Sequence, residues 1–131
     1  MTTKIIPVTR CGDITFHPNG RIDLTAHVTA ALSLHPGDVI NIARIEERFC
    51  EHYLYVARRA GETIGRHAGT CRPAKNNGHY LRVFCKRLTD YVLTRTHSTA
   101  GTHSTAGIRL RVGAAAEVNG LGIALPLIGL I

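Results

Sequence analysis

Positively charged side chains are the groups in this sequence with the clearest chemical use, and they are unevenly spread. Residues 57–95 hold nine Lys and Arg against two acidic residues, a net charge of +7, whereas residues 1–56 carry −1 and residues 96–131 carry +1. Cations clustered in this way neutralise phosphates and release counterions. We therefore expect an anionic partner such as nucleic acid to bind the middle third. A solvated surface that only keeps the protein soluble is the competing interpretation.

Histidine and cysteine side chains provide the other candidates for chemistry. His67, Cys71, His79 and Cys85 are the best zinc ligands by type, but their gaps of three, seven and five residues match no standard zinc pattern. Cys71 beside either histidine would pair a nucleophile with a base. The sequence has no oxyanion element, phosphate loop or paired carboxylates to complete such a site. We expect no enzyme, no bound metal and no cofactor.

The elements that position these groups begin with a compact run of signals in residues 13–44. Apolar residues alternate with polar ones at 14–17 and again at 22–24, on either side of a Pro-Asn-Gly turn. An Ala-rich segment, 25–34, then has helical spacing and stops at a Pro-Gly pair. A third strand is predicted at 39–42. The order is therefore strand, turn, strand, helix, turn, strand.

This run has a recognisable signature, made of Gly20-Arg21-Ile22, then Leu24, Val28, Leu32 and Leu34, and Pro36-Gly37-Asp38-Val39-Ile40. It resembles the AbrB/SpoVT/MazE-like swapped-hairpin family. In that family two chains interlace their hairpins into one β-barrel, so the resemblance implies an α+β, β-rich fold and an obligate homodimer. It also implies that Arg21, and more loosely Arg10, contact DNA. Thr25 stands where the family usually has Pro, and the predicted helix carries no Lys or Arg.

The rest of the chain predicts an extension. A strand at 53–57 is expected to pair with the segment ending near Arg44, and residues 58–79 are expected to form an exposed basic loop. Helical spacing is clearest in residues 80–93, where Leu81, Phe84, Cys85, Leu88, Tyr91 and Val92 share one face and Arg82, Lys86 and Arg87 lie on the other.

The C-terminal third begins with a perfect repeat. The hexapeptide THSTAG occurs twice in residues 96–107, which predicts a flexible linker. Strands at 108–112 and 123–128 follow, and the second is so apolar that the partner chain or the second helix must cover it. The expected organisation is a swapped-hairpin module (1–57), a basic loop and amphipathic helix (58–95), the linker (96–107) and a C-terminal β-hairpin (108–131).

The sequence therefore predicts a cytoplasmic, homodimeric, transcription-regulator-like protein that binds double-stranded DNA. No window is apolar for long enough to form a membrane span or a secretory signal. Arg21 has an alternative role, an ion pair with Asp23 or Asp13. The alternative function is a structural or antitoxin-like assembly module that docks a protein partner through the apolar C-terminus. The predicted nucleic-acid-binding residues are Arg10, Arg21, Arg58, Arg59, Arg66, Arg72, Lys75, Arg82, Lys86 and Arg87.

Overall fold

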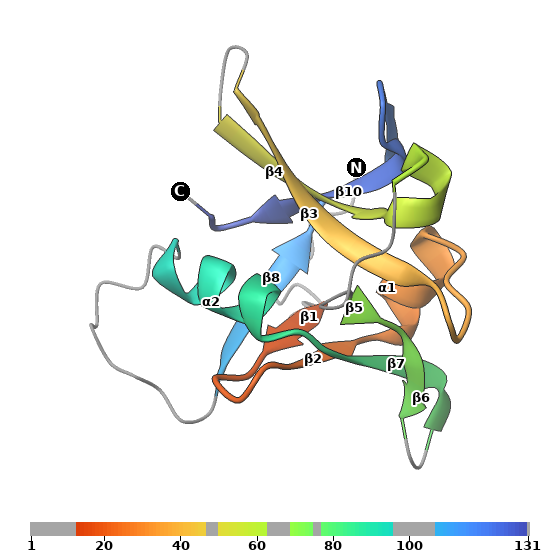
Figure 1. Ribbon diagram of the computed structural model, residues 1–131, viewed down its shortest axis with the longest axis vertical. Coiled ribbons are helices and arrows are strands. Elements are labelled where there is room, and N and C mark those ends of the chain that lie inside the picture. Colours follow the sequence, from red (N-terminus) through yellow and green to blue (C-terminus); the bar gives the residue numbers. More distant parts are fainter. Residues whose placement is uncertain (1–12, 47–49, 63–68, 75–76, 96–106, 131) are drawn as a thin grey trace, which may run out of the picture.

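The computed structural model is β-rich, with antiparallel strands that form a nearly closed barrel (Figure 1). It describes residues 13–46, 50–62, 69–74, 77–95 and 107–130. Within these ranges the strands are β1 (Ile14–Phe16), β2 (Arg21–Leu24), β3 (Val39–Glu46), β4 (Cys50–Val56), β5 (Gly69–Thr70), β6 (Arg72–Ala74), β7 (Asn77–Phe84), β8 (Ile108–Val112), β9 (Ala116–Val118) and β10 (Gly122–Ile128). The helices are α1 (Ala26–Ala31) and α2 (Lys86–Thr94), together with the 3₁₀ turn η1 (Ala57–Ala60).

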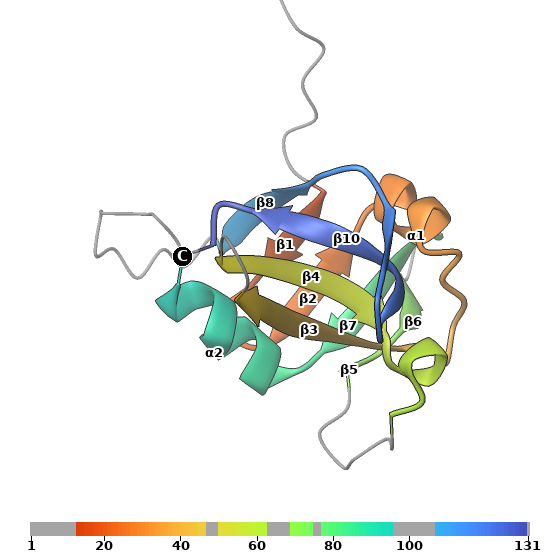
Figure 2. The ribbon, with the colours of Figure 1, turned by 90° about the horizontal axis from the view of Figure 1, so that it is seen from above.

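The sheet has the strand order β5-β3-β4-β10-β8-β1-β2-β7-β6, and β9 pairs with β10 outside this path. Two layers face each other, β3, β4 and β10 in one and β1, β2 and β7 in the other (Figures 1 and 2). The two ends of the path come together at Cys71, which lies between β5 and β6. Its backbone N–H donates to the Asp38 carbonyl at 2.7 Å, and its carbonyl accepts from the Gly37 N–H at 2.8 Å. The segment β5–Cys71–β6 therefore connects the β3 edge with the β7 edge, and the nearly closed barrel is formed within one chain.

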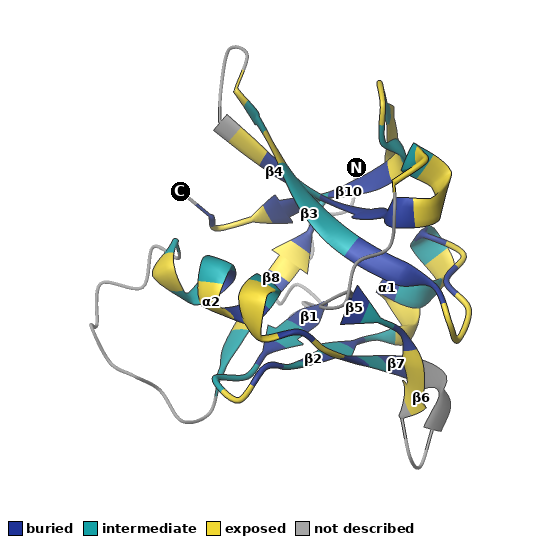
Figure 3. Ribbon diagram, in the orientation of Figure 1, coloured by how far each residue is buried: buried dark blue, intermediate teal, exposed yellow. Residues whose placement is uncertain are grey.

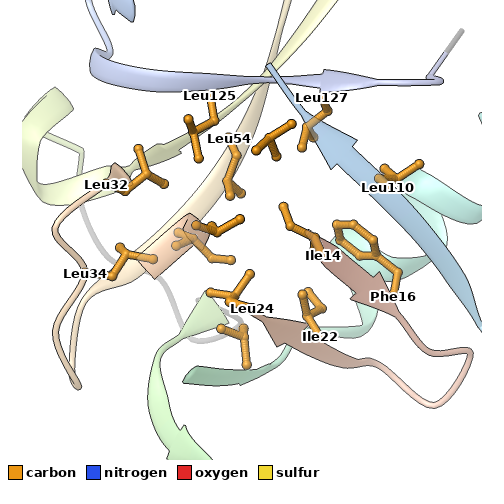
Figure 4. Close-up of a cluster of buried hydrophobic side chains, with 14 of the residues drawn as sticks. Ile14, Phe16, Ile22, Leu24, Leu32, Leu34, Leu54, Leu110, Leu125 and Leu127 are labelled. Carbon is orange, nitrogen blue, oxygen red and sulfur yellow. The ribbon is translucent and has the colours of Figure 1, made fainter. Parts of the chain in front are cut away.

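The core is aliphatic and fills the space between the two layers. Ile14 and Phe16 of β1 and Ile22 and Leu24 of β2 face Leu54, Leu125 and Leu127 of the opposite layer (Figure 4). The two helices lie at opposite ends of the barrel (Figures 1 and 2). The fully buried Val28 of α1 and Val92 of α2 belong to the same core. The side of α2 that faces away from the barrel is exposed (Figure 3). One continuous core therefore holds every major element.

Local signals predicted the first elements correctly. The strands at 14–17, 22–24 and 39–42 are present, and the strand at 53–57 belongs to β4, which pairs with β3 as expected. The helix predicted at 25–34 is shorter in the structure, where α1 ends at Ala31. Ser33 then adopts a left-handed conformation, φ 50°, and the chain turns Leu34 into the core.

The predicted helix at 80–93 is wrong in its first half. Residues up to Phe84 form β7, and only Lys86–Thr94 is helical. The reason is tertiary, because β2 needs a partner on its free edge and β7 provides it, with Leu81 and Val83 buried beside Leu24 and Ile22. The expected irregular loop at 58–79 is also wrong in part, since it contains η1, β5 and β6.

The apolar C-terminal run is β10, a strand between β4 and β8 in the sheet. Its inward side chains Leu125 and Leu127 are buried in the core of the same chain, so this run needs no partner chain to cover it. The strands of the predicted swapped-hairpin module also find their partners within the same chain, because β2 pairs with β7 and β1 pairs with β8. Homodimerisation stays a prediction, and residues 96–106 of the linker predicted at 96–107 lie outside the described residues.

The turn between β1 and β2 packs directly on the start of α2, and this contact can be measured. Gly20 and Gly37 have nearly the same backbone, φ +98° and +96°, but a Cβ on Gly20 would lie 3.3 Å from the Lys86 backbone, whereas one on Gly37 would meet nothing within 4 Å. Both Ala variants should lose about 1–2 kcal/mol of unfolding free energy from the positive φ. We expect Gly20→Ala to lose about 1 kcal/mol more in urea unfolding. Equal losses would mean that the turn does not press on α2.

Candidate nucleic-acid interface

Strand alternation places a set of charged side chains on the outside of the barrel. On β2, Ile22 and Leu24 are buried while Arg21 and Asp23 alternate with them, and on β7 Arg82 and Phe84 alternate with buried Leu81 and Val83. Since successive side chains of a strand point to opposite faces, these residues lie on the outer surface.

The strand register arranges the charged residues in a row. Arg72 of β6 pairs with Arg82 of β7, Arg82 pairs with Asp23 of β2, Asp23 pairs with Thr15 of β1, and Thr15 pairs with Arg109 of β8. The row therefore crosses five neighbouring strands. We call the surface formed by Arg21, Arg72, Arg82 and Arg109, together with His17, Asp23 and Phe84, the outer basic face.

Asp23 is the only acidic residue of the outer basic face, and three side chains share it. Arg82 Nε donates to Asp23 Oδ1 at 2.9 Å, and Arg21 Nε lies 3.4 Å from Oδ2. His17 Nε2 lies 2.9 Å from Asp23 Oδ2 and 3.1 Å from Arg21 Nη2. In a neutral imidazole this nitrogen either donates to the carboxylate or accepts from the guanidinium, so the two contacts compete.

The ionisation of Asp23 sets the charge of the face. Partial burial by itself raises the pKa of Asp23, but the hydrogen bonds from Arg82 and His17 and the charge of Arg21 outweigh it and hold the pKa below its usual value. The carboxylate is therefore ionised at neutral pH. Four arginines against one carboxylate leave the face with a net charge of +3.

Two further predicted residues border this face. Lys86 and Arg87 open α2 beside the β1–β2 turn, where Cys85 N donates to the Gly20 carbonyl at 2.9 Å. Lys86 pairs with Asp90 one helical turn later at 2.6 Å. Arg87 is exposed and has no ion-pair partner among the described residues. Arg82, predicted on this helix, lies instead on β7.

Arg58 and Arg59 lie away from the outer basic face and bind the connection between α1 and β3. Arg58 Nη2 donates to the buried carboxylate of Asp38 at 2.6 Å. Arg59 donates to the carbonyls of Leu32 and Ser33 at 2.6 and 3.2 Å, and so satisfies the end of α1. Their contacts stabilise the fold. The remaining predicted residues, Arg10, Arg66 and Lys75, lie outside the described residues.

Sequence reasoning missed three residues of the face, His17, Arg109 and Phe84. Arg109 was not a candidate, although its alternation with Leu110 in a predicted strand was a sufficient signal to place it outside. Phe84 was predicted on the apolar side of a helix, but its side chain is 60% exposed. The predicted alternative for Arg21 is present, because it contacts Asp23. Asp13 instead is buried and accepts a hydrogen bond from Val112 N at 3.0 Å.

Of the reactive candidates from the sequence, the structure describes the side chains of Cys71 and Cys85. Burial raises the pKa of the Cys71 thiol to about 12, with a further contribution from Asp38, so the thiol is protonated and a poor nucleophile at neutral pH. His67 and the His79 side chain lie outside the described set. Within the described residues no three His, Cys, Asp or Glu side chains are grouped to hold a metal ion.

One buried polar contact connects α2 to the barrel wall. His52 points inward from β4, and its Nε2 lies 2.8 Å from the hydroxyl of Tyr91 on α2. The guanidinium of Arg95 stacks 3.8 Å from the centre of the Tyr91 ring. Burial lowers the pKa of His52, and the charges of Arg44 and Arg95 lower it further. The folded state therefore favours the neutral form of the His52 imidazole.

This assignment predicts a pH dependence of stability. Because the pKa of His52 is lower in the folded than in the unfolded chain, the unfolded chain binds more protons, and the unfolding free energy should fall as pH drops below about 6.5. Urea unfolding between pH 7.5 and 5 should show a weaker pH dependence for His52→Gln, whatever its absolute stability. The control His27→Gln, at an exposed position, should keep the wild-type slope. Parallel curves for wild type and His52→Gln would refute the assignment.

Comparison with known proteins adds no assignment. No protein-family model, curated protein or solved structure matches the chain. Among the described residues no helix is long and apolar enough to cross a membrane. The outer basic face, with four arginines against one carboxylate, is therefore the candidate site.

Proposed function

We propose that the protein binds nucleic acid, with DNA as the expected ligand, through the outer basic face. One observation carries the proposal: arginines from four strands occupy outward positions along one row of the strand register, with a single carboxylate between them. Arg72 and Arg109, at the two ends of the row, are exposed, and their side chains make no hydrogen bond or ion pair with the described part of the chain. Their charges are available to an anion.

The dimensions of the row suit a phosphate backbone. Five neighbouring strands at about 4.8 Å per strand extend over at most about 19 Å along the sheet. This length corresponds to roughly five or six base steps at about 3.4 Å per step. Arginine is the side chain best suited to the contact, because its planar donors match two phosphate oxygens at once.

Asp23 gives the face a second property. It holds Arg21 and Arg82 in extended positions on the sheet while it neutralises one of their charges. All three side chains are about one-third exposed, so the ion pairs are screened and contribute little to stability. A phosphate can therefore replace the carboxylate as the partner of either arginine at low cost.

Regulation of transcription and homodimerisation are finer parts of the same proposal. Two copies related by a two-fold axis would present two such faces and favour a roughly palindromic site. Light scattering tests the dimer directly. The second candidate function is docking of a protein partner at the C-terminal strand, and it is favoured by Ile123 and Ile128 of β10, which are 39% and 55% exposed. Absence of any oligonucleotide binding at low salt would favour this second candidate.

The first test compares two double variants that each remove two positive charges. Arg72→Gln/Arg109→Gln removes the ends of the row, whereas Arg44→Gln/Arg95→Gln removes two charges outside the outer basic face. We expect the first to weaken duplex DNA binding and to reduce the slope of log K against log salt by about 2, since each lost phosphate contact accounts for roughly one unit. The control should keep the wild-type slope. Thermal unfolding confirms that both are folded, and equal effects of the two would contradict the location of the interface.

The second test removes the carboxylate. In Asp23→Asn the charge of the face rises by one and both arginines lose their fixed partner. Affinity for DNA at low salt should rise about 3- to 10-fold, while the unfolding free energy falls by about 0.5–1 kcal/mol. Fluorescence anisotropy and urea unfolding measure the two effects. An affinity that falls together with stability would mean that Asp23 organises the arginines for binding instead of competing for them.

A further inference from the structure

Phe84 is the most exposed of the large apolar side chains in the described structure, and the fold does not use its ring. It is the last residue of β7, between the buried Val83 and the buried Cys85, and 60% of it is exposed. The other exposed large apolar side chains, Ile123 and Ile128, belong to β10 in the opposite layer. A single exposed apolar residue needs no explanation by itself. Phe84 is of functional interest because its neighbours on the sheet are positively charged.

The neighbours of Phe84 on the sheet are charged. Arg21 is its direct partner across the β2–β7 ladder, and Arg82 lies two residues earlier on the same face of β7. Lys86 follows two residues later, next to the β1–β2 turn. An aromatic ring surrounded by cations differs from a protein-docking patch, in which apolar side chains cluster and charged residues are depleted at the centre. It has the composition of a surface that stacks a base and binds the adjacent phosphates.

The backbone under the ring is firmly held. Phe84 and Arg21 are paired in the antiparallel ladder, and the next residue, Cys85, donates its N–H to the Gly20 carbonyl at 2.9 Å. A Cβ on Gly20 would already press on the Lys86 backbone at 3.3 Å, so the turn and the start of α2 pack closely beside the ring. Phe84 is therefore presented on a rigid strand, and little conformational freedom of the backbone is lost when a ligand binds.

We infer that the outer basic face binds a nucleic-acid strand with at least one unpaired base, which stacks on Phe84 while Arg21 and Arg82 bind the flanking phosphates. This inference rests on the proposed function and specifies its ligand. Phosphate contacts alone do not separate duplex from single strand, because both present the same backbone. In a duplex the faces of the bases are stacked on one another and cannot reach a ring on a sheet surface. Only an unpaired base gains from Phe84.

The test measures anisotropy of labelled twelve-residue oligothymidine DNA, oligouridine RNA and a duplex of the same length. Wild type should bind a single strand more tightly than the duplex. Phe84→Leu, which keeps an apolar side chain but removes the ring, should weaken single-strand binding about tenfold and leave duplex binding unchanged. Phe84→Tyr should restore the affinity. Whichever single strand binds more tightly shows whether the face prefers DNA or RNA. Tighter binding of either strand than of the duplex supports stacking.

A direct optical readout is available because the chain contains no tryptophan. In Phe84→Trp the new indole is the only one, and its fluorescence should be quenched by a single strand but not by the duplex. The inference is overturned if Phe84→Leu weakens both ligands equally or neither, or if the indole is not quenched. In that case loss of binding by Arg72→Gln/Arg109→Gln would still uphold the proposed function. Wild type that binds no oligonucleotide at low salt would overturn both.

Discussion

The structure depends on burying one aliphatic core between two walls that come from distant parts of the chain. β1 and β2 cannot cover their inner face alone, and β4, β8 and β10 complete the enclosure. Because the core contains no Trp and few aromatics, its stability comes from many Leu, Ile and Val contacts. The sheet therefore curves into a nearly closed barrel, in which the segment around Cys71 pairs with β3 through β5 and with β7 through β6.

The formation of the barrel also determines which arginine side chains lie on its outer surface. Every strand that buries alternate residues has to expose the others, so arginines at the exposed positions of β2, β6, β7 and β8 are collected on one outer surface. At the end of the barrel near α1, arginines have a structural role instead. Arg58 and Arg59 bind the end of α1 and the buried Asp38, and thus stabilise a connection while contributing nothing to the outer basic face. The same residue type serves the fold in one place and a ligand in another.

The two helices seal the barrel by different chemistry. α1 is held by apolar contacts and by the arginines at its end, whereas α2 adds the contact between His52 and Tyr91 in a buried setting. α2 also adjoins the β1–β2 turn through Gly20, next to the residues of the outer basic face. The packing of the helix and the geometry of the candidate interface are therefore coupled at this turn, which fixes Phe84 and Arg21 on neighbouring strands.

Local sequence patterns were sufficient to predict the order of strands and helix in residues 14–42, the turns between them and the excess of positive charge in the middle third, because alternation, Gly and Pro signals and charge are local properties. They could not decide β7, since the spacing of Leu81, Phe84, Cys85 and Leu88 also fits a helix, and only the free edge of β2 selects the strand. Likewise the placement of Arg72 and Arg109 in one row of the strand register and the exposure of Phe84 follow from strand order. Pairings between distant segments, which no local pattern encodes, were settled by the tertiary structure alone.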